Sequence, residues 1–262
     1  MRIATWNING VKARLEGLTR WLEESAPEIA CLQEIKSVDE GFPSEAIERL
    51  GYNVATHGQK GFNGVALLSK RPLEDVTRRL PGDEDDEHAR WIEATVSTDK
   101  GAVRVVSLYL PNGNPIGTEK FTYKIAWMDR MLTRAEELLA TDEPIILAGD
   151  YNVIPEAGDA RHPERWVDDA LFQPESRGRH RALVNLGYVD AQRAVDRADG
   201  LYTFWDYQAG AWQKNNGIRI DHLMLSPSAA DLLETLTVEK HTRGWTKPSD
   251  HVPVVAALRT EA

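Results

Sequence analysis

Residues 145–153 read IILAGDYNV, and this short segment indicates both the architecture of the chain and the place of its chemistry. Ile145–Ala148 is an apolar run with the length and composition of a buried strand, and Gly149 follows it. The strand then leads directly into Asp150 and Asn152. A buried carboxylate without a partner is costly, so Asp150 requires a hydrogen-bonding partner, a cation or water where the strand ends.

The same kind of apolar run recurs along the chain and alternates with helical patterns. Most of these runs are rich in β-branched residues and are bounded by Gly, Pro or Asn, which predicts strands. The predicted strands are Ile3–Ile8, Ile29–Gln33, Val65–Ser69, Trp91–Ser97, Val103–Leu110, Ile145–Ala148, Ile218–Leu225 and Val254–Leu258. The predicted helices are Val11–Glu24, Ser44–Leu50 (with Ser44 as its N-cap), Thr118–Leu139, Arg179–Leu186 and Ser228–Leu233.

The chain has 262 residues with strands throughout and no internal repeat, low-complexity stretch or Ser/Gly linker. We therefore expect one α/β domain spanning residues 1–262. No apolar run reaches the roughly 18 residues that a membrane span needs. The N-terminus opens directly into a strand pattern, and Cys31 is the only cysteine. These features favour a cytoplasmic protein without an intrachain disulfide.

The formal net charge of −10 leaves two classes of phosphate chemistry open. One is an enzyme acting on a small-molecule or lipid phosphate. The other is a DNA enzyme whose basic residues gather on one face, although nucleic-acid binders are usually basic overall. Part of the acid lies in the run Asp83–Glu87, which we interpret as a solvated loop. Net charge therefore does not identify the substrate.

Three long irregular stretches are predicted at Asn112–Gly117, Pro155–Arg179 and Tyr207–Gly217. Loops of this length are uncommon in a compact domain unless they have a function or are disordered. Two of them combine basic and aromatic side chains, a composition that suits contact with a nucleic-acid backbone, although loop packing explains single aromatics equally well. These side chains are Arg161, His162, Arg165 and Trp166 in one loop, and Trp212 and Lys214 in the other, shortly after Trp205 and Tyr207.

Polar residues stand at the ends of most predicted strands. They are Asn7, Glu34, Tyr109, Asp150, Asn152, Asp221, Asp250 and His251. A single case would be an ordinary cap or turn, but the repetition predicts one shared polar cleft. Hard oxygen ligands without cysteine favour Mg²⁺, with Mn²⁺ as the alternative ion, over zinc.

The residue types also suggest separate roles within this cleft. Glu34 and Asp250 suit the metal, with Asn7 nearby, and Asp150 suits a general base for water. His251 suits a contact with a phosphate oxygen, supported by Asp221. Simpler interpretations stay open, since Glu34 could pair with Lys36 at the surface and Asn7 could only shape a turn. We interpret His222 as structural, because its side chain should face away from that of Asp221.

These residues stand in motifs that resemble the exonuclease III-type apurinic/apyrimidinic endonucleases of the endonuclease/exonuclease/phosphatase superfamily. The resemblance covers nearly the whole chain. Its segments are TWNINGVKAR (5–14), CLQEIK (31–36), GYNVATHGQKGFNGVALLSK (51–70), YLPNG (109–113), GDYNV (149–153), GIRIDHLMLS (217–226) and KPSDHVPV (247–254). Asn9 departs from some members, which carry an aspartate near the metal at this position.

The resemblance implies a four-layer α/β sandwich of two packed mixed sheets flanked by helices, the DNase I-like fold. It implies that Glu34 is the main metal ligand, with Asn7 and Asp250 close by, and that Asp150 orients water. Asn152, Tyr109 and His251 would contact the scissile phosphate, with Asp221 behind His251. The positions implied near the DNA are Arg90 and Asn112, together with an apolar pocket of Phe204, Ile218 and Ile220 for a base-free sugar.

We therefore expect a Mg²⁺-dependent DNA-repair phosphodiesterase that acts as a monomer in base excision repair. Its expected partner is double-stranded DNA with an abasic site or a blocked 3′ end, and no membrane. It would cut 5′ to abasic sites, remove 3′ blocking groups and digest duplex DNA from 3′ to 5′. Trp205 and Trp212 are added to the expected DNA contacts from their loops. The alternatives are a small-molecule or lipid phosphatase, favoured by the acidic charge, and a catalytically inactive nucleic-acid-binding regulator.

Overall fold

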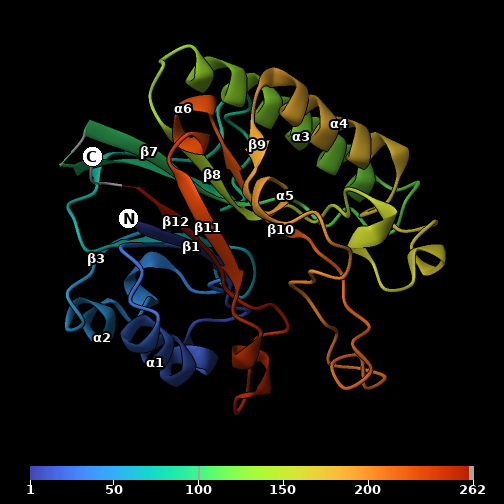
Figure 1. Cartoon of the computed structure of the whole chain (residues 1–262), viewed down its shortest axis with the longest axis horizontal. Helices are drawn as coiled ribbons and strands as arrows, with labels where there is room; N and C mark the ends of the chain where they lie inside the picture. The colour runs from blue at the N-terminus through green and yellow to red at the C-terminus, as the bar shows by residue number, and fades with distance from the viewer. Residues whose placement is uncertain (100, 260–262) are drawn as a thin grey trace.

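The computed structural model describes residues 1–99 and 101–259, and two six-stranded β-sheets lie face to face between layers of helices (Figure 1). The strands of the first sheet, sheet A, are β1 (Arg2–Asn7), β2 (Ile29–Gln33), β3 (Asn53–His57), β4 (Val65–Ser69), β11 (Leu233–Val238) and β12 (Val254–Leu258). Sheet B contains β5 (Glu74–Arg78), β6 (Trp91–Thr98), β7 (Gly101–Tyr109), β8 (Ile145–Asp150), β9 (Val189–Asp190) and β10 (Asp221–Leu225). The strand orders are β11-β12-β1-β2-β4-β3 and β5-β6-β7-β8-β10-β9.

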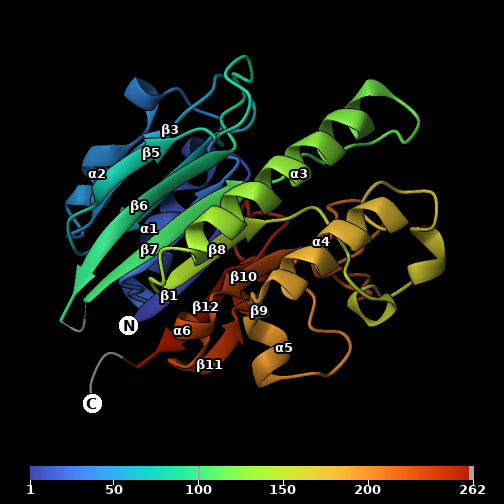
Figure 2. The ribbon, with the colours of Figure 1, turned by 90° about the horizontal axis from the view of Figure 1, so that it is seen from above.

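Helices cover the outer face of each sheet. The α-helices are α1 (Leu15–Glu24), α2 (Ser44–Glu48), α3 (Glu119–Leu139), α4 (Pro174–Leu186), α5 (Ala191–Val195) and α6 (Pro227–Ala230). Short 3-10 helices occur at η1 (Lys12–Arg14), η2 (Asp39–Gly41), η3 (Ala157–Asp159), η4 (Pro163–Arg165) and η5 (Lys240–Gly244). Figure 1 shows α1 and α2 beyond sheet A, and Figure 2 shows α3 and α4 lying side by side across sheet B.

Three apolar clusters account for this layering. The central cluster joins residues of both sheets, such as Ile3 and Leu67 of sheet A with Val105 and Leu223 of sheet B. A second cluster joins the outer face of sheet B to α3 and α4, and a third joins the outer face of sheet A to α1 and α2. Because both faces of the central strands are buried, these strands read as nearly continuous apolar runs. The predicted four-layer α/β sandwich is confirmed.

Several predicted boundaries were wrong. The strand expected over Ile218–Leu225 begins only at Asp221, and of the three residues before it only Ile218 forms isolated bridges. The stretch Pro155–Arg179 contains η3, η4 and the first turn of α4, which begins at Pro174. The helix expected over Ser228–Leu233 is only the single turn of α6, and Leu233 already belongs to β11. Ser44 is the first residue of α2 and makes no capping hydrogen bond, since Pro43 holds the N-cap position.

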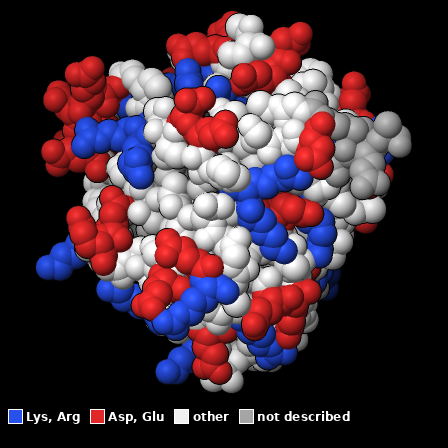
Figure 3. Space-filling model, turned by 90° about the vertical axis from the view of Figure 1, so that its left-hand side faces the viewer, with Lys and Arg blue, Asp and Glu red and all other residues white. Residues whose placement is uncertain are grey.

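Charge is mixed at the end of the molecule where β1 begins. Figure 3 shows this side, and its Lys and Arg side chains lie among Asp and Glu side chains without a continuous basic surface. The acidic run at 83–87 is mostly exposed, as expected, but Asp86 is not. Its carboxylate accepts a hydrogen bond from Tyr123 and pairs with Arg130, both on α3. Among the described residues, no helix is long and apolar enough to cross a membrane.

Candidate active site

Strand direction explains why the polar strand ends meet. β1 is parallel to β2, and β7 is parallel to β8, so Asn7, Tyr109 and Asp150 all stand at carboxyl ends of strands. β12 is antiparallel to β1 and β10 is antiparallel to β8, so these strands contribute their starts to the same edge. Asp221 is therefore paired directly with Asp150, and His251 lies just before β12. The predicted clustering of these side chains thus follows from topology.

Asn7 connects the two sheets at this edge. Its Nδ2 donates to Glu34 Oε1 at 3.0 Å and to Asp150 Oδ2 at 2.9 Å, so one amide bridges a carboxylate from each sheet. The Asn7 side chain is fully buried, and Asn9 N donates to its Oδ1 at 3.0 Å. Asn7 therefore does more than shape a turn, because it fixes the separation of Glu34 and Asp150.

The backbone turns sharply where these residues leave their strands. Asn9, Glu34 and Asn152 have positive φ angles of 46°, 49° and 45°. A left-handed backbone is unusual for residues other than glycine and is least costly for asparagine, so Glu34 carries conformational strain. Strain of this kind persists only where the surroundings enforce it, as the pairs Gly10 N to Glu34 O and Ile35 N to Gly64 O do here. The strained turn aims Glu34 at the shared edge.

His251 is held between two carboxylates. Its Nδ1 lies 2.9 Å from Asp221 Oδ2, and its Nε2 lies 3.7 Å from Asp150 Oδ2. Thr203 Oγ1 donates to the same Asp221 oxygen at 2.6 Å. Asp221 therefore fixes the imidazole so that Nε2 faces Asp150. His222 points the other way, with its Nε2 3.3 Å from Val153 O, and is buried as expected for a structural residue.

The surroundings shift the pKa values of these groups strongly. Burial raises the pKa of Asp150 to about 7, against the opposing effect of His251. Burial alone would lower the pKa of His251, but Asp221 and Asp150 raise it to about 10. Burial and the charges of Glu34 and Asp150 raise the pKa of Tyr109 well above its usual value. At neutral pH the edge thus offers a charged imidazolium, a neutral phenol and a carboxylate that can accept a proton.

Glu34 differs from Asp150 because cationic and hydrogen-bonding groups surround it. Burial would raise its pKa, but the Asn7 amide and the Lys36 ammonium hold it below the usual value. Lys36 Nζ lies 2.9 Å from Glu34 Oε2 and 2.5 Å from Asn9 Oδ1. The expected Glu34–Lys36 pair is therefore present, but it lies within the polar edge instead of apart from it.

The donor set fits a divalent cation. Glu34, Asp150 and His251 each offer one ligand atom, and these atoms all lie within 4.8 Å of one another. The two carboxylates are the hard donors that Mg²⁺ or Mn²⁺ prefer, and the Asn7 amide lies beside them with its Nδ2 toward both. Asp250 lies further along the network, where its Oδ1 accepts from Asn9 Nδ2 at 3.0 Å. Its role as a metal ligand stays a prediction.

Two loops on the far side of Asp150 are joined by a residue that sequence reasoning missed. Asn152 Nδ2 donates to Leu110 O at 2.8 Å, and Asn112 Nδ2 approaches Asn152 Oδ1 at 3.4 Å. Beneath them, the buried Lys124 Nζ donates to Asn112 O at 3.0 Å and to Asn152 O at 2.5 Å. The sequence did carry a signal for this burial, because Lys124 stands at helical spacing between the apolar Phe121 and Met128 and so lies on the same helix face.

Arg90 supports Tyr109 from the side. Its guanidinium lies 4.9 Å from the centre of the Tyr109 ring, and its NH1 donates to Tyr109 O at 3.2 Å. The guanidinium Nε is buried without a hydrogen-bond partner among the described residues. Arg90 thus lies at the polar edge, and its contact with DNA stays a prediction.

An apolar wall borders the polar edge. The ring centroid of Phe204 lies 4.9 Å from that of His251, and Phe204 also bridges to Ile218. Ile218 and Ile220 form one apolar cluster with Ile154 and Leu171, against which Phe204 packs. On the outer side, a hollow of about 250 Å³ is lined by Ile218 and by basic and aromatic residues of the preceding loop, namely Arg161, His162, Arg165 and Trp166.

Trp205 and Trp212 differ in their access to DNA. Trp205 is fully buried, its Nε1 donates to Asn215 Oδ1 at 3.0 Å, and it packs edge-on against Trp212. The expectation of a direct DNA contact by Trp205 therefore does not fit its burial, and its ring instead supports the 207–217 loop. Trp212 is only partly buried, and its contact with DNA stays a prediction.

With this geometry in place, comparisons with known proteins identify the family. The model of the endonuclease/exonuclease/phosphatase family matches residues 4–251. The chain belongs to the endonuclease/exonuclease/phosphatase family. Exodeoxyribonuclease III of Haemophilus influenzae is 34% identical over 267 residues, which cover 99% of this chain and 100% of the relative. A Bacillus subtilis exodeoxyribonuclease is 31% identical and covers 97% of this chain and 98% of its own.

Solved structures of similar family proteins share the whole fold. An AP endonuclease from Archaeoglobus fulgidus has a TM-score of 0.93 at 33% identity, covering 98% of this chain and 99% of the other. A 3′ phosphatase from Neisseria, solved with a product DNA hairpin, has a TM-score of 0.95 at 34% identity over 99% of both chains. The predicted family membership is confirmed.

Proposed function

We propose that the chain is a divalent-metal-dependent DNA-repair phosphodiesterase that acts on abasic sites and on blocked 3′ ends of duplex DNA. The observation that carries the proposal is the arrangement of three groups at one sheet edge: Asp150, the oriented His251 and the apolar Phe204 beside it. The relatives are named as exodeoxyribonucleases and AP endonucleases, and the Neisseria relative was solved with DNA, which supports a DNA substrate.

Asp150 is the group best placed to take a proton from the attacking water. A pKa near 7 lets a carboxylate accept a proton and release it again at neutral pH. The two hydrogen bonds to its oxygens, from Asn7 Nδ2 and Asn152 N, fix the carboxylate without neutralising it. We therefore assign Asp150 as the base that orients and deprotonates water.

The phosphate would be held by donors that remain protonated at neutral pH. His251 stays an imidazolium and Tyr109 stays a phenol, so both can donate to non-bridging oxygens as negative charge builds up. Asn152 and Asn112 add amide donors from the neighbouring loops. A divalent ion held by Glu34, with Asn7 and Asp250 close by, would supply charge stabilisation at the phosphate and leaving oxygens.

The apolar wall provides the basis for selecting damage. Ile218 and Ile220 are buried, and the partly buried Phe204 lies between them and His251. A sugar without a base can approach such a wall, whereas an intact nucleotide brings a base that the site must accommodate. We propose that this wall, together with the 161–166 loop, receives the damaged nucleotide from a double-stranded partner bound by a monomer.

The test is incision of a duplex that carries a single abasic analogue, measured with Mg²⁺, with Mn²⁺ and with EDTA. We expect incision 5′ to the analogue with either ion and none with EDTA. The substitution Asp150→Asn should reduce kcat by about a hundredfold or more, because a general base typically contributes that much. Fold and DNA binding should persist, since an asparagine still accepts one of the two hydrogen bonds.

The control is Asp85→Asn, an exposed acid in the 83–87 run, which should cut at the wild-type rate. Near-normal turnover by Asp150→Asn would refute the assignment of the base. Absence of incision with every divalent ion would refute the DNA-repair function and favour a small-molecule phosphate as the substrate.

A further inference from the structure

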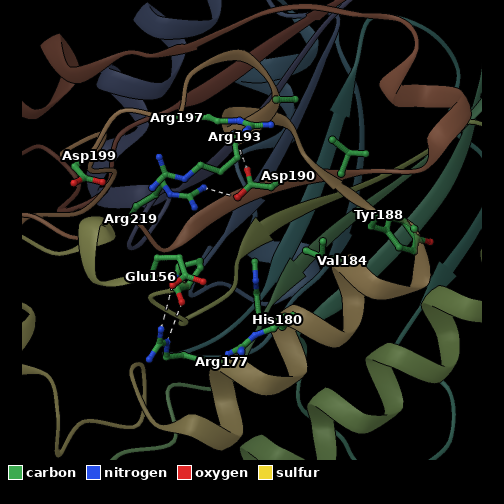
Figure 4. Close-up of a pocket in the computed structure, with 15 residues that line it drawn as sticks. Glu156, Arg177, His180, Val184, Tyr188, Asp190, Arg193, Arg197, Asp199 and Arg219 are labelled. Carbon is green, nitrogen blue, oxygen red and sulfur yellow. Dashed lines mark hydrogen bonds and ion pairs between the residues drawn. The ribbon is translucent and has the colours of Figure 1, made fainter.

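A second cavity lies behind the catalytic edge, between α4 and α5. It has a volume of about 740 Å³, within the usual range of roughly 300–1,000 Å³ for ligand sites. Its walls come from the 155–156 segment, α4, the 187–190 turn, α5 and Arg219, all beyond the catalytic residues described above (Figure 4). The proposed reaction does not use any of these side chains.

The cavity is cationic in an acidic protein. Five arginines line it against three carboxylates, and a fourth carboxylate, Asp159, pairs with two of these arginines, which leaves an excess of one positive charge in a chain that carries −10 as a whole. The arginines are Arg177, Arg181, Arg193, Arg197 and Arg219, and the acids are Glu156, Asp190 and Asp199. Arg177 and Arg181 stand four residues apart on α4. Arg193 lies on α5, and Arg197 follows four residues later, just after that helix. Both segments therefore contribute arginines to the same cavity.

Ion pairs neutralise only some of these arginines. Arg219 is tied to Asp159 and Asp190, Arg193 to Asp159, and Arg177 to Glu156. The side chains of Arg181 and Arg197 are exposed and make no hydrogen bond or ion pair within residues 1–99 and 101–259. Two uncompensated guanidiniums at one cavity match the charge of a phosphate monoester dianion, which guanidiniums bind with good geometry.

A buried histidine adds an unpaired polar atom to the wall. His180 is only 5% exposed, and its Nε2 has no hydrogen-bond partner in the part of the chain that the structure describes. Burial lowers the pKa of His180 to about 4, so the ring is neutral at pH near 7 and offers a hydrogen bond, not a charge. Buried polar atoms are nearly always satisfied, so this unpaired nitrogen is unusual in a ring that lines the cavity.

The rest of the lining suits an organic body attached to the phosphate. Val184, Tyr188 and Val189 form an apolar side, and the Tyr188 hydroxyl is already used in a bond to Ala135 O. Figure 4 shows Asp199 and Glu156 on the side of the view away from Val184 and Tyr188, with Glu156 paired to Arg177. Asp199 makes no hydrogen bond or ion pair with the described residues, so its carboxylate is free to accept from hydroxyl or amino groups.

We propose that this cavity binds a nucleoside monophosphate at a site separate from the catalytic edge. The phosphate lies between Arg181 and Arg197, the base lies against Val184 and Tyr188, and Asp199 accepts from sugar or base donors. The Arg219–Asp159 pair connects this site to the loop that follows Asn152, so the ligand adjoins the catalytic segment without entering it. The site does not depend on which DNA lesion the enzyme cuts.

A metal ion does not fit the same place. His180, Asp190 and His222 offer three ligand atoms within 4.8 Å of one another. Arg219 NH1, however, donates to Asp190 Oδ2 at 2.7 Å and lies 3.1 Å from His222 Nδ1. The Arg219 guanidinium already lies where a metal ion would have to bind these three residues. We therefore expect the cavity to bind an anion and not a metal ion.

The test is calorimetric titration of the full chain in EDTA with deoxyadenosine monophosphate, deoxyadenosine and inorganic phosphate as separate probes. We expect the nucleotide to bind with a stoichiometry of one, and each fragment at least about tenfold more weakly. Arg181→Gln and Arg197→Gln should each weaken nucleotide binding about fivefold or more. The matched control, Arg49→Gln at the exposed position just after α2, should bind like the wild type.

Incision of the abasic duplex, measured on the same preparations, separates this proposal from the proposed function. Both cavity variants should cut within about twofold of the wild-type rate. Nucleotide binding that is unchanged in Arg181→Gln and Arg197→Gln would place the ligand at the catalytic edge and overturn the proposal. Equal binding of deoxyadenosine and its monophosphate would also overturn it, because the arginines would then contribute nothing.

Discussion

Lys124 shows how a single buried residue can position the groups that meet the phosphate. Its ammonium donates to the carbonyls of Asn112 and Asn152, which lie in the separate loops that follow β7 and β8. Burial lowers the pKa of Lys124 to about 7, so holding the charge there is costly. A residue retained at such a cost in stability is expected to serve the geometry of the site.

We predict that Lys124→Met lowers kcat by about tenfold while the free energy of unfolding changes by less than about 1 kcal/mol. Methionine fills a similar volume and removes a poorly solvated charge, so the fold loses little. The two carbonyls, however, lose their common donor, and Asn152 moves relative to Asp150. The measurements are steady-state incision of the abasic duplex and urea unfolding.

Lys120→Met, on the exposed face of the same helix, is the control and should leave both measurements unchanged. A parallel loss of stability and activity in Lys124→Met would contradict the positioning role, because general unfolding would then explain the effect.

The site residues that could be predicted from the sequence are polar or charged residues at positions where an apolar strand ends. Asp150 and Glu34 are acids at the ends of apolar strands, and this mismatch is visible without coordinates. The partners that set their pKa values come from distant segments, as Asn7 lies 143 residues from Asp150 and His251 lies 30 from Asp221. Thr203 carries no local signature of its contact, and the helical position of Lys124 indicates burial but not which carbonyls it meets, so both contacts required the structure.

Among the elements, the strands missed from sequence share one position. β3 and β11 are the edge strands of sheet A, and β5 and β9 are the edge strands of sheet B. An edge strand has one neighbour and is partly exposed, so its residues need not be uniformly apolar. Glu74–Arg78 is exposed at every position except Val76, so this strand carries little apolar signal in the sequence. Central strands, buried on both faces, were found at nearly their true bounds, except β10, whose predicted start was three residues early.

The catalytic edge depends on the pairing of β7 with β8. Leu108 pairs with Gly149, and the next pair in the register is Tyr109 with Asp150. A Cβ on Gly149 would lie 2.0 Å from Leu108 O, closer than any real contact, and the obstacle is backbone. Only glycine therefore allows the two strands to approach at this position.

We predict that Gly149→Ala destabilises the fold by about 2 kcal/mol or more and reduces incision beyond the fraction unfolded. Overpacking of this kind pushes β8 away from β7 and displaces Asp150 from Tyr109. The control is Gly178→Ala in α4, where an added Cβ meets nothing within 4 Å. That substitution should stabilise the chain by about 0.5–1 kcal/mol, because alanine favours helix. Wild-type stability in Gly149→Ala, measured by urea unfolding, would contradict the close approach.

At the scale of the whole molecule, the stability of the sandwich is coupled to pH through histidines buried between sheet B and α4. His180 packs against Tyr151 and His222, with ring centroids 6.1 Å and 5.1 Å apart. Burial and the Arg219 charge lower its pKa to about 4 from an ordinary value of 6.5, although Asp190 opposes the shift. The unfolded chain therefore binds a proton over this interval that the folded chain does not. The free energy of unfolding must then fall as pH decreases from 6.5 toward 4, and the contribution is fully present above 6.5.

We predict that His180→Phe reduces this acid-induced loss of stability by roughly 2–3 kcal/mol, since each pKa unit corresponds to about 1.4 kcal/mol. The measurement is urea unfolding of the wild type and the variant at about pH 7.5 and about pH 4.5. His241→Phe, with a side chain that is 55% exposed, is the control and should follow the wild type at both values. The same phenylalanine also removes the unpaired Nε2, so the variant should be no less stable than the wild type at about pH 7.5. Equal losses in the wild type and His180→Phe would show that protonation of this buried ring does not contribute to acid unfolding, and other groups in the sandwich would have to account for it.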